Sequence, residues 1–329
     1  MGVLEIMPNL NQPIDPTSNP QDSTNLQAST NPQASTNLQS TIANGTVHPI
    51  VSADWLRLHL EDSSVVVIDC RFSLMEPAAG RKQYDISHIQ GAHYLDLNQD
   101  LSQAVQAHGG RHPLPDVQTF SSKLRAMGID DDTWVVLYDS ARLSYAARAW
   151  WLLRYLGHDR TLLLNGGWQA WTGMHYPTTK ELPETISGNF TPVVQSDWTV
   201  DINHIKTAIN PSSVLIDSRE TVRYRGDREP IDPIAGHIPG AINYPWQQVT
   251  DERGFINAEL QADRWANLQD NTETKINPTE PNPTEDNPTE IIVYCGSGVT
   301  ACVNLLSLSL AGHHAKLYVG GWSDWCSYL

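Results

Sequence analysis

Short runs of branched apolar residues alternate along the chain with longer segments in which apolar residues recur at helical spacing. The apolar runs have the length of buried strands and begin the motifs at 65–71, 135–140, 214–219 and 291–296. Helical patterns cover 144–157 and 300–312, and each ends in a glycine, the residue type that best tolerates the positive φ common after a helix C-terminus. The pattern predicts an α/β fold, with mostly parallel sheets covered by helices on both faces.

The same unit occurs twice. Asp54-Trp55 is repeated as Asp197-Trp198, and the other repeated motifs are VVVIDCR with VLIDSR, SHIQGA with GHIPGA, VVLYDS with IIVYCG, and NGGWQAW with VGGWSDW. Two copies in the same order indicate a tandem duplication rather than a solenoid. We therefore expect an N-terminal domain over 47–178, a linker over 179–195 and a C-terminal domain over 196–329.

Two segments lack the composition of a packed domain. Residues 1–46 are rich in Asn, Gln, Ser, Thr and Pro, and residues 270–290 repeat the motif NPTE. Segments with so few apolar residues bury too little surface to offset the entropy of ordering them. We predict a disordered tail over 1–46 and a disordered insertion over 270–290.

Composition and charge argue against several classes of protein. The 329 residues carry a formal net charge of -16, which disfavours binding to a nucleic-acid backbone. No apolar run approaches the roughly 20 residues of a membrane-spanning helix. Four cysteines without metal-ligand spacing, and a start without a secretory signal pattern, predict no metal site and a reducing cytoplasmic location.

Cys295 is the strongest candidate for chemistry. It follows the apolar run IIVY and precedes a helical pattern, and Gly296 and Gly298 let the loop curl tightly. Backbone N–H groups and the helix dipole can then converge on the sulfur, stabilise a thiolate and make Cys295 a nucleophile. The alternative is a small apolar residue that merely ends a strand.

The loop Cys295–Thr300, the motif GHIPGA at 236–241, the motif HPLP at 112–115 and the two GGW turns resemble the two-domain sulfurtransferases of the rhodanese superfamily. The resemblance extends over about 47–329, and the loop is most similar to that of the 3-mercaptopyruvate sulfurtransferases. It implies two tandem rhodanese-like domains of which only the second is catalytic, because Asp139 stands at the position of Cys295 in the first copy.

The resemblance also implies a reaction. Cys295 accepts a sulfur atom from 3-mercaptopyruvate as a persulfide and passes it to a thiol, cyanide or a thioredoxin-like acceptor. No cofactor is implied. The alternatives are thiosulfate as the donor and, in another class, a non-catalytic persulfide carrier or regulatory binding module. A cysteine-dependent phosphatase ranks low, because Ala301 stands where its loop would require arginine.

Several further residues receive roles from the resemblance. Arg223 matches the first substrate arginine, and Arg228 is the candidate for the second, since Pro230 occupies the usual position. Ser297 is expected to act with His88, supported by Asp69, although His88 could instead brace a turn. The remaining expected substrate contacts are the loop residues Gly296, Gly298, Val299 and Thr300.

Overall fold

The computed structural model describes residues 42–43, 46–184, 186–208, 213–251, 253–256, 258–266, 268 and 290–329. Most of the predicted tail over 1–46 lies outside the described residues. At its end, β1 (Ile42–Ala43) pairs antiparallel with β2 (Thr46–Val47). The predicted insertion over 270–290 also lies outside the described residues, except for Glu290, which begins a strand.

The first copy forms a parallel sheet of five strands in the order β3-β8-β7-β4-β6. The strands are β3 (Ile50–Val51), β4 (Val65–Asp69), β6 (His93–Tyr94), β7 (Trp134–Tyr138) and β8 (Thr161–Leu164). Every residue of β7 is buried, and alternate residues belong to different core clusters, with Val135 and Leu137 in one and Val136 and Tyr138 in the other. Both faces of this sheet are therefore covered, as the continuous apolar runs predict.

Helices supply the two covering layers. Core residues of α3 (Val117–Ala126) and α4 (Ala146–Tyr155) join the cluster on one face, and those of α1 (Ala53–His59) and α5 (Gly167–Gly173) join the cluster on the other. The shorter elements of this half are α2 (Ala79–Ile86) and the antiparallel pair β5 (His88–Ile89) and β9 (Thr178–Thr179).

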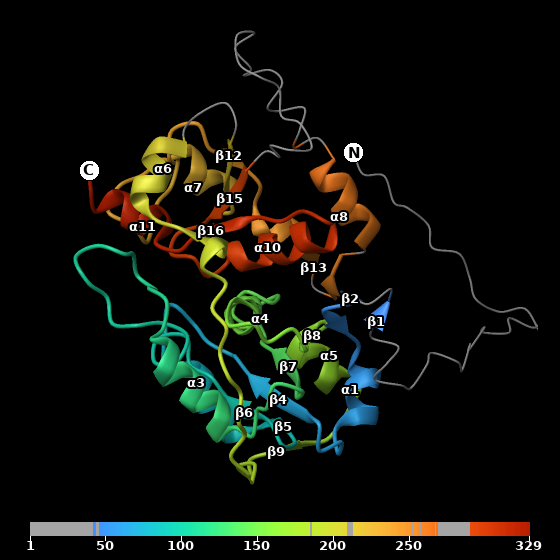
Figure 1. Ribbon diagram of the computed structural model, residues 1–329. Helices are drawn as coiled ribbons and strands as arrows, with labels where there is room; N and C mark the ends of the chain where they lie inside the picture. The colour runs from blue at the N-terminus through green and yellow to red at the C-terminus, as the bar shows by residue number, and fades with distance from the viewer. Residues whose placement is uncertain are drawn as a thin grey trace, which may run out of the picture. The chain divides into compact units, whose positions relative to one another are not determined.

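The second copy repeats this architecture with the strand order β10-β16-β15-β11-β12, again all parallel. Its elements are coloured from yellow to red in Figure 1. The strands are β10 (Thr199–Val200), β11 (Ser213–Asp217), β12 (Ile242–Asn243), β15 (Glu290–Tyr294) and β16 (Lys316–Tyr318). The helices are α6 (Ile202–Ala208), α7 (Thr221–Arg225), α8 (Ala258–Trp265), α10 (Ala301–Leu310) and α11 (Gly321–Cys326). A hairpin of β13 (Thr250–Asp251) and β14 (Gly254–Phe255) precedes α8. The predicted α/β fold with two parallel sheets is confirmed.

One core joins the two halves. Helices α4 and α10 pack against each other, and residues of both belong to a single cluster that also contains core residues of both sheets. Residues Ala146–Leu153 of α4 and Ala301–Leu308 of α10 are all buried. A helix that is buried on every side needs apolar residues around its whole circumference, which explains why neither sequence has a polar face. Along the chain, α4 is the helix that follows β7, and α10 is the helix that follows β15.

The glycines that end these helices adopt the predicted conformation, with φ of +84° at Gly157 and +83° at Gly312. No helix among the described residues is long and apolar enough to cross a membrane.

Candidate active site

Cys295 lies directly after β15 and six residues before the first residue of α10, in a loop whose residues are buried up to Val299. The strand brings the cysteine to the carboxyl edge of the sheet, where the N-terminus of α10 adds positive potential. Cys295 is 2% exposed, yet it lines a cavity of about 390 Å³. The thiol is therefore a cavity-facing group at the base of a pocket that can hold a small substrate.

The pocket is built by both halves of the chain. From the second half come Gly296, Ser297, Val299 and Thr300 of the loop, together with Arg223 and Arg228. From the first half come Leu74, Arg111, His112, Ser144 and Tyr145. Five of the expected loop and arginine contacts thus border the pocket; Gly298 does not, and its role is to turn the backbone.

The loop is fixed by the first turn of α11. Trp322 N–H donates to the carbonyl of Cys295 and Ser323 N–H to that of Gly296, both at 2.9 Å. Gly298 has φ +71°, and a Cβ there would lie 2.4 Å from the carbonyl oxygen of Val319. The loop and the end of β16 therefore approach so closely that only glycine fits.

The equivalent loop of the first half shows what these backbone groups can bind. The carboxylate of Asp139, at the position of Cys295, accepts backbone N–H groups of Ala141, Leu143, Tyr145 and Ala146 at 2.8–3.0 Å. Burial raises the pKa of Asp139, whereas these four donors favour its ionised form. A loop of this shape is therefore a receptor for an anion, and in the first half the carboxylate of Asp139 occupies it permanently.

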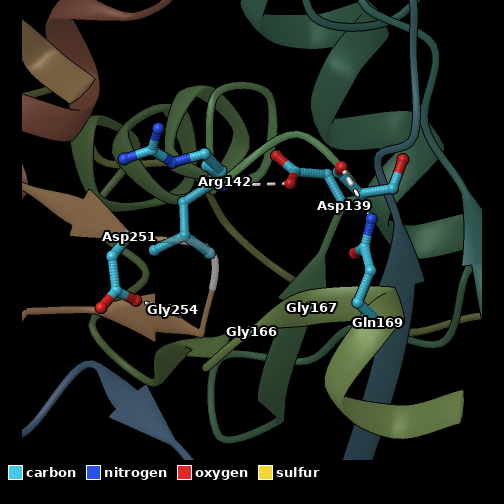
Figure 2. A pocket seen from close by; sticks show the side chains of 9 residues that line it. Asp139, Arg142, Gly166, Gly167, Gln169, Asp251 and Gly254 are labelled. Atoms are coloured by element: carbon cyan, nitrogen blue, oxygen red, sulfur yellow. Dashed lines mark hydrogen bonds between the residues drawn. The ribbon is translucent and has the colours of Figure 1, made fainter. Parts of the chain in front are cut away.

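A second cavity, of about 350 Å³, lies beside this internal anion (Figure 2). It is bordered by Asp139, Arg142 and Gly167 from the first half and by Asp251 and Gly254 from the hairpin of the second. Arg142 does not face a ligand here, because its Nη2 donates to the carbonyls of Gln247, at 2.6 Å, and Thr250. The first-half loop thus has an aspartate in place of the cysteine, and its arginine is held by carbonyl groups of the second half.

Ser297 is hydrogen-bonded across the two halves. Its Oγ lies 2.7 Å from Nδ1 of His112, a buried residue of the motif HPLP. Burial, followed by the nearby Arg148 and Arg111 guanidinium groups, lowers the pKa of His112 to about 3. The imidazole is neutral near pH 7 and, in its Nδ1–H tautomer, donates to the hydroxyl oxygen.

The predicted pairing of Ser297 with His88 and Asp69 is wrong. His88 bonds the carbonyl oxygens of Tyr84 and Glu181, and Asp69 pairs with Arg71 and accepts the hydroxyl of Tyr138. The second half repeats these contacts, since His237 bonds the carbonyl of Tyr224 and Asp217 pairs with Arg219. Contacts made alike in both copies brace the fold, which is the alternative reading of His88.

The two expected substrate arginines differ in setting. Arg223 is half-buried and pairs with Glu229 at 2.7 Å and Asp232 at 3.0 Å. Arg228 is exposed and its side chain makes no hydrogen bond or ion pair with another described residue. Both border the cavity, but only Arg223 is held in one position by its partners.

Two arginines of the first half lie at the site although the sequence did not predict them there. Arg111 enters the cavity and forms an ion pair with Asp232. Arg148 of α4 is fully buried, and its guanidinium donates to the carbonyl of Gly298 at 3.0 Å, while its Nε has no hydrogen-bond partner among the described residues. The motif HPLP, which follows Arg111, was the available signal, but sequence alone does not say which loop it meets.

The other thiols are not placed for catalysis. Cys70, Cys302 and Cys326 are free and buried, and burial raises the pKa of each. Within the described ranges, no three His, Cys, Asp or Glu side chains cluster as metal ligands.

Comparisons with known proteins agree with this geometry. The family model for the rhodanese-like domain matches residues 52–174 and again 200–328. The chain is 39% identical over 284 residues to a probable 3-mercaptopyruvate sulfurtransferase of Pseudomonas aeruginosa, covering 84% of this chain and 94% of the relative. It is 36% identical over 270 residues to a putative thiosulfate sulfurtransferase of Mycobacterium tuberculosis, covering 80% and 88%.

A solved structure gives the same result. The 3-mercaptopyruvate sulfurtransferase from Leishmania major superposes with a TM-score of 0.70 at 26% identity, covering 86% of this chain and 76% of that one. Two matched domains, two parallel sheets and a cysteine loop at the edge of the second lead to one conclusion: the chain belongs to the rhodanese family and is a two-domain sulfurtransferase.

Proposed function

We propose that the protein takes a sulfur atom from 3-mercaptopyruvate and delivers it to a thiol, cyanide or thioredoxin-like acceptor through a persulfide on Cys295. The observation that carries this proposal is a cysteine beside Ser297 and Arg223 in one cavity of about 390 Å³. A nucleophile, a hydroxyl and a cation match the thiol, ketone and carboxylate of that donor.

The first half-reaction uses these groups in order. Arg223 binds the donor carboxylate, and the Cys295 thiolate attacks the donor sulfur. A sulfur–sulfur bond forms while the carbon–sulfur bond breaks, and its electron pair leaves as the enolate of pyruvate. Neutral His112, in its Nδ1–H tautomer, donates to the Ser297 oxygen, so the Ser297 hydroxyl keeps its own proton to donate in a hydrogen bond to the enolate oxygen. Protonation of the carbon by solvent then releases pyruvate.

The second half-reaction returns the enzyme to its starting state. The acceptor attacks the outer sulfur, the sulfur–sulfur bond breaks and its electron pair returns to Cys295. The loop amides stabilise this leaving thiolate, by analogy with the four backbone donors around Asp139. The cytoplasm remains the expected compartment for this exchange, since its reducing conditions keep Cys295 and an acceptor thiol free of disulfides.

Thiosulfate is the second candidate donor, because several relatives are named for it. Arg223 is already paired with two carboxylates, so the site offers a dianion little uncompensated positive charge. We therefore expect 3-mercaptopyruvate to be the better donor.

Steady-state turnover with both donors tests the proposal. We expect kcat/KM to be at least about tenfold higher with 3-mercaptopyruvate, a preference of about 1.4 kcal/mol. Cys295→Ser should abolish activity, whereas the matched control Cys302→Ser should retain it. Preference for thiosulfate would select the second donor, and activity in Cys295→Ser would exclude the persulfide.

A further inference from the structure

Arg148 of α4 places a positive charge in the buried interface between the two halves. Its side chain is completely buried, and it donates only to backbone carbonyls, those of Gly298 at 3.0 Å, His112 at 3.3 Å and Leu101 at 3.4 Å. Its Nε has no hydrogen-bond partner among the described residues. A guanidinium stays protonated in proteins, and an unpaired buried cation is costly. Packing alone therefore does not account for an arginine at this position.

The other buried arginines of the described chain are neutralised by acids. Arg71 pairs with Asp69 and Arg219 pairs with Asp217, each at 2.6 Å. Within the same described ranges, Arg148 forms no ion pair with an aspartate or glutamate, and its hydrogen-bond acceptors are uncharged. Its charge is thus left without a permanent counterion.

Two thiols lie near enough to supply that counterion. Burial lowers the pKa of Arg148, and negative charge on Cys302 or Cys295 would act in the opposite direction. Cys302 Sγ donates to the same Gly298 carbonyl at 3.4 Å, but burial raises the pKa of Cys302 to about 12, so it is a neutral thiol near pH 7. Cys295 remains, and it is the thiol that the proposed reaction ionises.

The other cations around Cys295 are balanced by carboxylates or exposed to solvent. The balanced group of ion pairs at the cavity consists of Arg111, Arg223, Asp232 and Glu229. Arg228 is exposed, so water and salt screen its charge, and His112 is neutral near pH 7 because its pKa is about 3. Arg148 contacts the loop but does not border the cavity. Its charge therefore acts on Cys295 and not on a bound substrate.

We propose that Arg148 is a positioning residue for sulfur transfer, whose buried guanidinium balances the negative charge that Cys295 carries as a thiolate and as a persulfide. The inference rests on the proposed function, which makes Cys295 the nucleophile. The cation is unpaired while Cys295 is a neutral thiol and paired once it is ionised, so the buried charge favours the ionised form. Hydrogen bonds to the loop and to the His112 segment hold the guanidinium in place.

The pH dependence of alkylation tests the inference without any sulfur donor. Iodoacetamide is uncharged and reacts with the thiolate, so its rate at Cys295, followed by mass spectrometry in the full chain, reports ionisation. Arg148→Gln removes the charge and keeps an N–H donor, whereas Arg148→Lys keeps the charge. We expect Arg148→Gln to move the midpoint of the pH–rate profile up by about one pH unit, which slows alkylation below the midpoint roughly tenfold. Arg148→Lys should keep the midpoint close to that of the unaltered protein.

A residue that only braces the interface makes a different prediction. Loss of bracing should slow alkylation at every pH, and Arg148→Lys should be slowed at least as much as Arg148→Gln. Charge balance instead predicts rates that converge at high pH, where Cys295 is ionised in every variant. Arg154→Gln, on the same helix and paired with the exposed Asp159, is the matched control and should leave the midpoint unchanged. If urea unfolding shows that Arg148→Gln does not fold, Arg148→Met, which needs no buried hydrogen-bond partner, takes its place.

An unchanged midpoint in Arg148→Gln, or an equal shift in Arg148→Lys, would overturn the inference. Failure of the proposed function is a separate result: the unaltered protein would not turn over 3-mercaptopyruvate, while the midpoint of alkylation at Cys295 would still depend on Arg148.

Discussion

Gly298→Ala is the substitution that tests the close approach between the active loop and the end of β16. The residue has φ +71°, and the added Cβ would lie 2.4 Å from the carbonyl oxygen and 3.2 Å from the carbonyl carbon of Val319. Gly312→Ala is a matched control, since Gly312 has φ +83° with nothing within 4 Å of the added atom. Both variants carry the same backbone strain, and only one carries the overlap.

The two costs can be separated. A left-handed conformation costs a non-glycine residue roughly 1–2 kcal/mol, which is the whole expected effect of Gly312→Ala on the free energy of unfolding. At Gly298 the Cβ must move at least 0.6 Å to reach the 3.0 Å that real contacts show, and such overpacking adds about 1–3 kcal/mol. We expect Gly298→Ala to lower stability by roughly 2–5 kcal/mol.

Activity should separate the variants further. Gly298 lies between Ser297 and Val299, and its carbonyl oxygen accepts a hydrogen bond from the buried Arg148 guanidinium. A backbone shift at Gly298 therefore displaces the groups around the Cys295 sulfur. Displacement of catalytic groups by about 1 Å can cost 10²-fold in rate. Urea unfolding and turnover per folded molecule would measure both effects. If Gly298→Ala matched Gly312→Ala in stability and retained full turnover, the argument for a fixed loop would be refuted.

Three further results are expected. His112→Gln should lower kcat with 3-mercaptopyruvate by roughly 10²-fold, the lower range for loss of an acid–base group; an unchanged kcat would remove His112 from the mechanism. The same variant tests how the free energy of unfolding depends on pH. The pKa of His112 is about 3 in the folded protein against an ordinary value of 6.5, so the stability contributed by neutral His112 is complete above pH 6.5 and is lost as pH falls towards 3. Between pH 7 and pH 5 the wild type should therefore lose up to about 2 kcal/mol more than His112→Gln in urea unfolding, and equal losses would contradict the burial of the imidazole. Asp139→Asn should destabilise the protein by about 2–4 kcal/mol, because an amide cannot accept all four backbone donors; turnover per folded molecule should persist, and its loss would give the first-half loop a role in the reaction.

Local patterns predicted the local parts of the site. Continuous apolar runs indicated strands buried on both faces, and the loop after the run IIVY placed Cys295 between a strand and a helix. Each of these features depends on neighbours along the chain, where hydrophobic periodicity and glycine carry physical information. The same holds for the helix ends at Gly157 and Gly312.

The partner of Ser297 depends on contacts between the halves, which no local pattern contains. His88 was expected because its motif resembles a functional one, but its repetition as His237 is the sign of a structural role. His112 and Arg111 reach the site because a segment of the first half crosses onto the second, and the hairpin of the second half crosses onto the first in the same manner. Each half of the duplicated fold thus contributes a segment that contacts the other half. Of these two segments, only the one from the first half lies beside the cysteine loop.

The most direct test of the central claim is to locate the transferred sulfur. The protein would be incubated with 3-mercaptopyruvate without acceptor, capped with an alkylating reagent and digested with trypsin, which leaves Cys295 and Cys302 on one peptide because Lys275 and Lys316 are the nearest cleavage sites. Fragmentation mass spectrometry should place a single added sulfur on Cys295 and none on Cys302. A sulfur on Cys302, or no added sulfur on a protein that still turns over the donor, would contradict the account.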